Sequence, residues 1–196
     1  MHAFSIHKAS VADIPLIRRM ADVVFRRTYR DILSPAQMEY MMDMMYSEDS
    51  LRDQIQAPGK EFFIAYSGDP VSARTDRGDI VWPPCVHPAG YLSFEEDGCT
   101  ENGLPRYHLQ KLYILPEYQH AGLGRQMLEF VKDRLTDVNP EGCRIELNVN
   151  RANPATGFYE RMGMVRDRQG DFPIGNGFFM NDYIYILDLL SKTPDE

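Results

Sequence analysis

The segment that most constrains the fold runs from Tyr107 to Met127. A run rich in β-branched and aromatic residues ends at Leu115-Pro116, a short polar turn follows, and Gly122-Leu123-Gly124 opens a helical pattern. A strand, a glycine turn and a helix start in this order hold a diphosphate on backbone N–H groups, because glycine places no Cβ between the backbone and the anion. The helix dipole favours negative charge at the same place, and Arg125 adds a positive charge.

Two well-known phosphate loops do not fit this glycine turn. The dinucleotide pattern GxGxxG requires glycine where Met127 stands, and the P-loop requires Lys followed by Ser or Thr where Arg125-Gln126 stands. The remaining pattern is Gln119-x-x-Gly122-x-Gly124, preceded by a strand and a proline. The alternative without a ligand is an ordinary strand-to-helix loop.

A second motif follows further along the chain. The stretch Cys143–Asn150 predicts a strand, and a helix with Asn153 and Tyr159 comes next and is closed by Gly163-Met164. Together the two motifs resemble the GNAT superfamily of N-acetyltransferases, whose acetyl-CoA signature is Gln/Arg-x-x-Gly-x-Gly/Ala after a strand and a proline. The resemblance is specific between about residues 107 and 164.

The order of elements predicts an α/β (α+β) fold with a mixed, mostly antiparallel sheet of about seven strands and flanking helices. We expect a single domain over 1–196, with an inserted loop at about 67–88 that is rich in Pro, Gly and charge. The resemblance implies that the strand near 107–115 splays from the strand 143–150, and that the cofactor lies in the opening. The other predicted strands are 4–8, 61–66, 90–94, 164–168 and 178–189, and the predicted helices are 14–30, a second from Pro35, 48–56, 122–138 and 153–162.

The resemblance assigns acetyl-CoA as the co-substrate. Strand backbone would hold the pantetheine arm, the glycine turn would cradle the diphosphate, and Asn153 would hydrogen-bond the arm. Asn153 also precedes Pro154 as a good helix cap, and both roles are compatible. The predicted cofactor residues are Leu112, Tyr113, Ile114, Gln119, His120, Ala121, Gly122, Leu123, Gly124, Arg125 and Asn153.

Two side chains are candidates for proton transfer. The resemblance implies that Tyr159 is the general acid that protonates the leaving thiolate, and the alternative is a core tyrosine. His108 occupies the strand position where some family members carry a basic glutamate, and the alternative is a structural histidine. Asn148 stands where other members carry a glutamate and cannot act as a base. Glu95, Glu146 or a water chain therefore also remain candidates for the base.

The acceptor site is expected between the first two helices and the last hairpin. By position, Phe25, Tyr29 and Tyr183 are the candidate substrate-binding residues. The methionine stripe on the second helix is read as core. Asp31, Asp43 and Asp182 are either cation-binding or solvated.

The composition limits the partners of this chain. Its net charge of −8 argues against nucleic acid and is compatible with a cationic amine, although solubility alone also explains it. Neither the apolar runs nor the N-terminus indicate a membrane partner or a secretory signal. Three cysteines make no disulfide framework and their spacing with histidine fits no zinc module, so we expect a cytoplasmic protein without metal. The sequence is compatible with a homodimer.

These observations lead to one expected activity. The protein would transfer an acetyl group from acetyl-CoA to a primary amine of a small molecule, such as a polyamine, by direct attack in a ternary complex. The alternatives are acetylation of protein N-termini or lysines, an acyl-CoA-binding module without turnover, and an unrelated phosphate-binding α/β protein.

Overall fold

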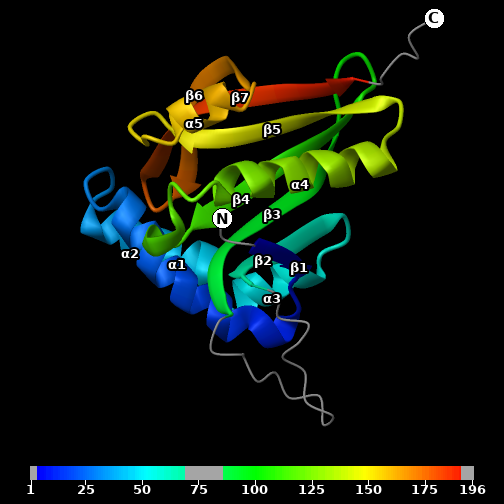
Figure 1. Cartoon of the computed structure of the whole chain (residues 1–196). Coiled ribbons are helices and arrows are strands. Elements are labelled where there is room, and N and C mark those ends of the chain that lie inside the picture. Colours follow the sequence, from blue (N-terminus) through cyan, green and yellow to red (C-terminus); the bar gives the residue numbers. More distant parts are fainter. Residues whose placement is uncertain (1–3, 69–85, 191–196) are drawn as a thin grey trace, which may run out of the picture.

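A seven-stranded sheet forms the centre of the protein in the computed structural model, which describes residues 4–68 and 86–190 (Figure 1). The strand order is β1-β2-β3-β4-β5-β7-β6, and every neighbouring pair is antiparallel except β4 and β5. This confirms the predicted mixed, mostly antiparallel sheet. The strands are β1 (Phe4–Lys8), β2 (Lys60–Ser67), β3 (His87–Cys99), β4 (Pro105–Ile114), β5 (Gly142–Asn150), β6 (Val165–Gly175) and β7 (Phe178–Leu190).

Helices α2 and α4 begin where the capping residues of the sequence predict. Ser34 accepts a hydrogen bond from the Gln37 N–H at 3.2 Å and is followed by proline, which needs no partner for its nitrogen at the first helical position. Gly122 precedes α4 with a φ of 85°, a left-handed conformation that glycine adopts without strain. The helical elements are η1 (Val11–Asp13), α1 (Ile14–Tyr29), α2 (Pro35–Tyr46), α3 (Glu48–Gln56), η3 (Pro116–Tyr118), α4 (Leu123–Val138) and α5 (Thr156–Arg161).

Helices cover both faces of the sheet and create two apolar cores. On one face, α1, α2 and α3 pack on β2 and β3 around Ile17, Phe25 and Leu51. On the other face, α4 lies along the sheet (Figure 1) and packs on β5 through Met127 and Val131. The central strands β2, β3 and β4 contribute side chains to both cores. Among the described residues, no helix is both long and apolar enough to span a bilayer.

The parallel pair of strands separates part-way along its length. The ladder between β4 and β5 comprises Arg106 with Arg144, Tyr107 with Ile145 and His108 with Glu146, although β4 continues to Ile114 and β5 to Asn150. A bulge starts the separation, because Phe94 of β3 faces Leu109 and Ser93 faces Lys111, which leaves Gln110 as an extra residue. The predicted splayed strand pair is thus confirmed.

Some boundaries differ from the predicted ones. Strand β3 spans His87–Cys99 rather than 90–94, and β6 extends to Gly175 rather than 168. Helix α5 starts at Thr156 rather than 153, because Asn153 Oδ1 accepts the Ala155 N–H at 2.9 Å and forms a turn before the helix. Of the predicted insertion at 67–88, residues 69–85 lie outside the described residues.

Candidate functional site

The N-terminus of α4 offers backbone donors at the open end of the splay. Gly122 caps the helix without a side-chain hydrogen bond, and a Cβ added to it would meet nothing within 4 Å. The first N–H groups of a helix have no intrahelical partner, so those of Leu123, Gly124 and Arg125 are available to an anion. The Arg125 side chain is exposed in the same turn. This arrangement suits a diphosphate.

Gly124 has a different role from Gly122. A Cβ at this position would lie 3.2 Å from Ile114 Cδ1 and 3.2 Å from Phe158 Cζ. The missing side chain therefore lets α4 approach both β4 and α5 closely. Bulk at this position would meet protein before it met an anion.

The residues before Gly122 shape the turn from β4 into α4. The Gln119 side chain folds back, and its Nε2 donates to the Ile114 carbonyl at 3.1 Å. His120 adopts a φ of 62°, an uncommon left-handed conformation for a residue with a Cβ. Ala121 is exposed beside it. The turn thus exposes the predicted cradle residues at the end of β4.

The last residues of β4 present a strand edge towards the opening. In the described part of the chain, Leu112, Tyr113 and Ile114 pair with β3 on one side and lie outside the β5 ladder on the other. Leu112 and Ile114 pack into the core under α4, whereas Tyr113 packs into the core under α1. Backbone groups of an unpaired strand edge can hydrogen-bond an extended ligand.

Tyr159 lies on α5 beside this opening. Its side chain is 8% exposed, and its ring centroid lies 5.2 Å from that of Phe158 and 6.2 Å from that of Tyr185. Burial raises the pKa of Tyr159, and the nearby Tyr29 raises it further. The phenol therefore keeps its proton at neutral pH, and in this buried state it is a weaker acid than a free tyrosine.

Tyr29 connects the two sides of the opening from α1. Burial raises the pKa of Tyr29, and hydrogen bonding by the side chains of Tyr113 and Asn153 partly offsets this. Tyr113 belongs to β4 and Asn153 follows β5, so Tyr29 lies at the level where the two strands are apart. Asn153 is buried and caps the turn before α5 through its oxygen.

Two further tyrosines, which the sequence did not indicate, extend this group beneath α2. The Tyr91 hydroxyl donates to that of Tyr46 at 2.9 Å, and the ring centroids of Tyr91 and Tyr113 lie 5.4 Å apart. Burial raises the pKa of Tyr46, Tyr91 and Tyr113 well above the ordinary value. The hydroxyl groups buried with Tyr113 in this core are therefore neutral.

His108 lies at the closed end of the splay. It is the last residue of the β4–β5 ladder and faces Glu146 across it. Burial lowers the pKa of His108, while the charges of Glu146, Asp97 and Glu95 act in the opposite direction. The two glutamates considered as bases are in ion pairs, since Glu146 is 2.9 Å from Arg168 and Glu95 is 2.8 Å from Lys60.

The structure brings together two of the three predicted acceptor residues. Phe25 is fully buried, and its ring centroid lies 4.5 Å from that of Tyr29. Tyr183 packs into the core under α4, on the opposite face of the sheet, with Arg166 Cζ 4.6 Å from its ring centroid. The residue before it, Asp182, lies on the α1 face and is 4% exposed.

The hairpin of β6 and β7 is joined to α2. Gln37 Nε2 donates to the Phe179 carbonyl at 2.8 Å, and the Tyr40 hydroxyl donates to the Ile174 carbonyl at 2.7 Å. The ring centroids of Tyr40 and Phe178 lie 5.5 Å apart. These contacts hold the hairpin against α2.

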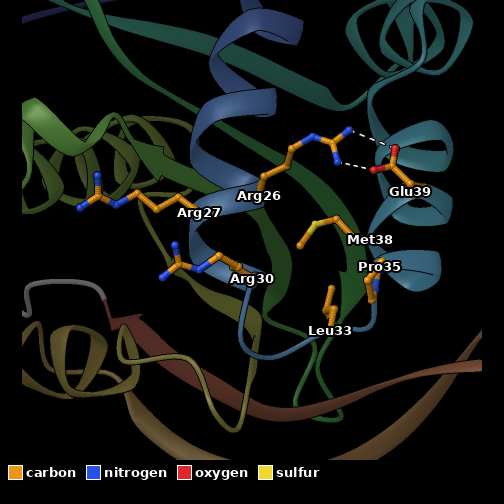
Figure 2. Close-up of a pocket in the computed structure, with 7 residues that line it drawn as sticks. All are labelled: Arg26, Arg27, Arg30, Leu33, Pro35, Met38 and Glu39. Atoms are coloured by element: carbon orange, nitrogen blue, oxygen red, sulfur yellow. Dashed lines mark hydrogen bonds and ion pairs between the residues drawn. The ribbon is translucent and has the colours of Figure 1, made fainter.

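A hollow of about 370 Å³ lies elsewhere, between the C-terminal half of α1 and the start of α2 (Figure 2). Figure 2 shows that Arg26 reaches across to Glu39, whereas Arg27 and Arg30 point away from α2. Neither Tyr159 nor Asp182 lines this hollow. It therefore belongs to the outer surface of the helices rather than to the opening between the strands.

Nucleophilic or metal chemistry finds little support in the described residues. Cys99 is exposed in strand β3, and Cys143 is buried in β5, where burial raises the pKa of its thiol. A raised pKa makes a thiol a poorer nucleophile at neutral pH. No group of three or more His, Cys, Asp or Glu in residues 4–68 and 86–190 is arranged to hold a metal ion. Cys85 lies outside the described residues.

Comparisons with known proteins agree with this geometry. A family model described as the acetyltransferase (GNAT) domain matches residues 58–165. An uncharacterized N-acetyltransferase in the pepI 3′ region of Lactobacillus delbrueckii subsp. lactis is 24% identical over 181 residues, which are 90% of this chain and 92% of that protein.

Solved structures show the same fold. The PaiA N-acetyltransferase of Thermoplasma acidophilum, in complex with coenzyme A, superposes with a TM-score of 0.67 at 20% identity, over 94% of this chain and 98% of that one. The ribosomal-protein-S18-alanine N-acetyltransferase of Escherichia coli gives a TM-score of 0.60 at 17% identity, over 99% of each chain.

Proposed function

We propose, from the premise that this chain belongs to the GNAT family of acetyltransferases, that it acetylates a primary amine of a small molecule. As a member of this family it is an acetyl-CoA-dependent N-acyltransferase. The transfer would be direct, with both substrates bound together and no acylated enzyme. In the described chain the thiols support this, because Cys143 is buried and Cys99 lies in strand β3 away from the splay.

The observation that carries the proposal is the end of the β4–β5 ladder at His108 and Glu146, together with the N-terminus of α4, where no side chain occupies the first N–H groups. The freed edge of β4 would bind the pantetheine arm, and the N–H groups that follow Gly122 would bind the diphosphate. The thioester would then lie between Tyr159 of α5 and Tyr29 of α1. Such positioning of two reactants is itself a large part of catalysis.

The chemistry requires one bond to form and one to break. The amine nitrogen attacks the thioester carbon, the C–S bond breaks, and the thiolate leaves. Tyr159 would donate a proton to that thiolate, which the neutral state of its buried phenol permits. A backbone N–H released at the Gln110 bulge would stabilise the oxyanion.

The closed hairpin supports a small acceptor. Two hydrogen bonds hold β6 and β7 against α2, and Tyr29 and Asp182 are almost fully buried behind them. A slender amine fits such a site better than a folded polypeptide does. Acetylation of protein N-termini or lysines is the alternative acceptor class.

The test is acetyl-CoA consumption, followed as free thiol, against putrescine, spermidine, L-lysine, arylalkylamines and short peptides with free N-termini. Thiol release that depends on a small amine supports the proposal. Release with peptides alone would show that the acceptor is a polypeptide amine rather than a small molecule. Tight acetyl-CoA binding without release from any acceptor would favour a binding module without turnover.

A further inference from the structure

We propose that Asp182 binds the ammonium group of the acceptor and takes its proton before attack. This inference rests on the proposed acetyl transfer and adds a catalytic residue to it. The proposal is carried by the burial, the hydrogen-bonding state and the position of this carboxylate.

The Asp182 side chain is buried without a counter-ion. It is 4% exposed, and Oδ2 accepts one hydrogen bond, from Asn148 Nδ2 at 3.4 Å. Among the described residues, no donor reaches the buried Oδ1 atom. A buried carboxylate with an unsatisfied oxygen destabilises a fold, so its retention needs a reason.

The position of Asp182 is the open end of the splay, on the acceptor side. It pairs with Asn150, the last residue of β5, beyond the point where β4 has separated. Its neighbour on the same strand face, Met180, packs against the core that contains Tyr29. Burial raises the pKa of Tyr29, and the charge of Asp182 acts in the same direction.

A cationic donor is the partner that this environment lacks. Burial raises the pKa of Asp182, while the hydrogen bond from Asn148 and the charge of Arg151 lower it. Arg151 is itself engaged with Asp171, so it does not neutralise Asp182 directly. Tyr29 is neutral. An alkylammonium would supply both the hydrogen bond and the charge that Oδ1 is missing.

The protons balance in this scheme. The ammonium gives one proton to Asp182, which later releases it to solvent. The free amine attacks, the C–S bond breaks, and Tyr159 protonates the thiolate. The second proton lost by the nitrogen returns Tyr159 to its neutral form. The net products are the amide, coenzyme A and one proton.

Asp182 and His108 are competing candidates for the general base, and mutations can distinguish them. His108 lies at the closed end of the opening among Glu95 and Glu146, whereas Asp182 lies at the end where Tyr29 and Asn153 meet. We therefore compare Asp182→Asn with His108→Gln. Asp188→Asn is the matched control, because it changes the same chemistry six residues along β7, where the carboxylate pairs with Arg144 at the surface.

The assay measures kcat/KM for the best amine of the panel and Kd for acetyl-CoA. Asp182→Asn is expected to lower kcat/KM about 100-fold or more, the range of general base catalysis, and to leave the acetyl-CoA Kd unchanged. His108→Gln is expected to lose less activity than Asp182→Asn, and the control Asp188→Asn is expected to stay within about 3-fold of the wild type. Wild-type activity in Asp182→Asn, or the larger loss in His108→Gln, overturns the inference.

A second readout distinguishes catalysis from a structural role. Ethylamine is a cation at about pH 7, as any alkylamine with a pKa near that of lysine is, whereas trifluoroethylamine is largely neutral there. Asp182→Asn should lose much more activity with the first amine than with the second. Equal losses with both, or a lower melting temperature, contradict the proposal. A wild-type protein that acetylates no amine at all would instead refute the proposed function.

Discussion

Lys111 Nζ lies 2.5 Å from Gln54 Oε1, so that a side-chain amide of α3 binds the amine of a lysine buried in β4. Lys111 is only 3% exposed, and its nitrogen also lies 5.7 Å from the ring centroid of Tyr46. Burial and the charge of Lys60 lower the pKa of Lys111 to about 7, with Glu95 acting in the opposite direction. The side chain of Lys111, next to the bulge in β4, therefore loses its proton more easily than an exposed lysine does.

Replacing this lysine by methionine should stabilise the protein, and more so at low pH. Because the folded-state pKa of Lys111 is depressed, its cost to stability is full below about pH 7 and is relieved as pH rises towards the unfolded value of 10.5. We expect Lys111→Met to gain about 2 kcal/mol more at about pH 6 than at about pH 9. Urea unfolding at both pH values measures this, with Lys8→Met on the surface as control. A gain independent of pH would show that Lys111 does not titrate in this range.

Removal of the Tyr159 hydroxyl should affect the chemical step alone. Tyr159→Phe keeps the ring against Phe158 and Tyr185 but removes the proton donor. We expect kcat to fall about 10- to 1000-fold with little change in acetyl-CoA affinity. Steady-state kinetics and a binding titration check this. Unchanged turnover would remove Tyr159 from the mechanism.

Charge reversal at the start of α4 should weaken the binding of acetyl-CoA. Arg125→Glu places a negative charge in the first helical turn, where the dipole and the free N–H groups favour an anion. We expect the acetyl-CoA Kd to rise about 10-fold or more, and the rise to shrink in high salt. Lys132→Glu, two turns further along the same helix, is the control. Equal effects of the two variants would argue against the diphosphate cradle.

Gly124→Glu should damage packing as well as binding. Its Cβ would meet Ile114 and Phe158, so α4 must move away from β4 and α5. We expect a loss of about 1–3 kcal/mol in the free energy of unfolding without cofactor. Arg125→Glu introduces a glutamate one residue later and should show no such loss. If both variants unfold like the wild type, the close approach at Gly124 is dispensable.

Local chemistry made much of this fold predictable. Ser34-Pro35 marks the start of α2 and the glycine turn marks the start of α4, because helix caps depend on residues within one turn of chain. The methionine stripe of α2 is core, as read, since Met38 and Met41 are buried. The ends of β3 and β6 differ from the predicted ones because they are fixed by pairing with the next strand, Cys99 with Pro105 and Gly175 with Phe178, rather than by an alternation of apolar residues.

Side-chain orientation on β7 was harder to predict. Asp31, Asp43 and Asp182 were equivalent in the sequence, yet Asp182 alone is buried, whereas the other two are exposed. The alternation of Tyr183, Tyr185 and the leucines that follow could have placed Asp182 on the opposite face. The burial of Lys111 could not be predicted in this way, because the bulge at Gln110 changes which residues of β4 point to each face of the sheet.

The early end of the β4–β5 ladder has a consequence for the lifetime of the protein. Beyond His108 and Glu146 the two central strands no longer pair with each other, and the proposed binding of acetyl-CoA would fill the space between them. A ligand at 100 times its Kd stabilises the folded state by about 2.7 kcal/mol, a large share of what holds a typical domain together. Metabolic supply of acetyl-CoA would therefore set the survival of this enzyme as well as its turnover, and cells starved of acetyl donors should contain less of it.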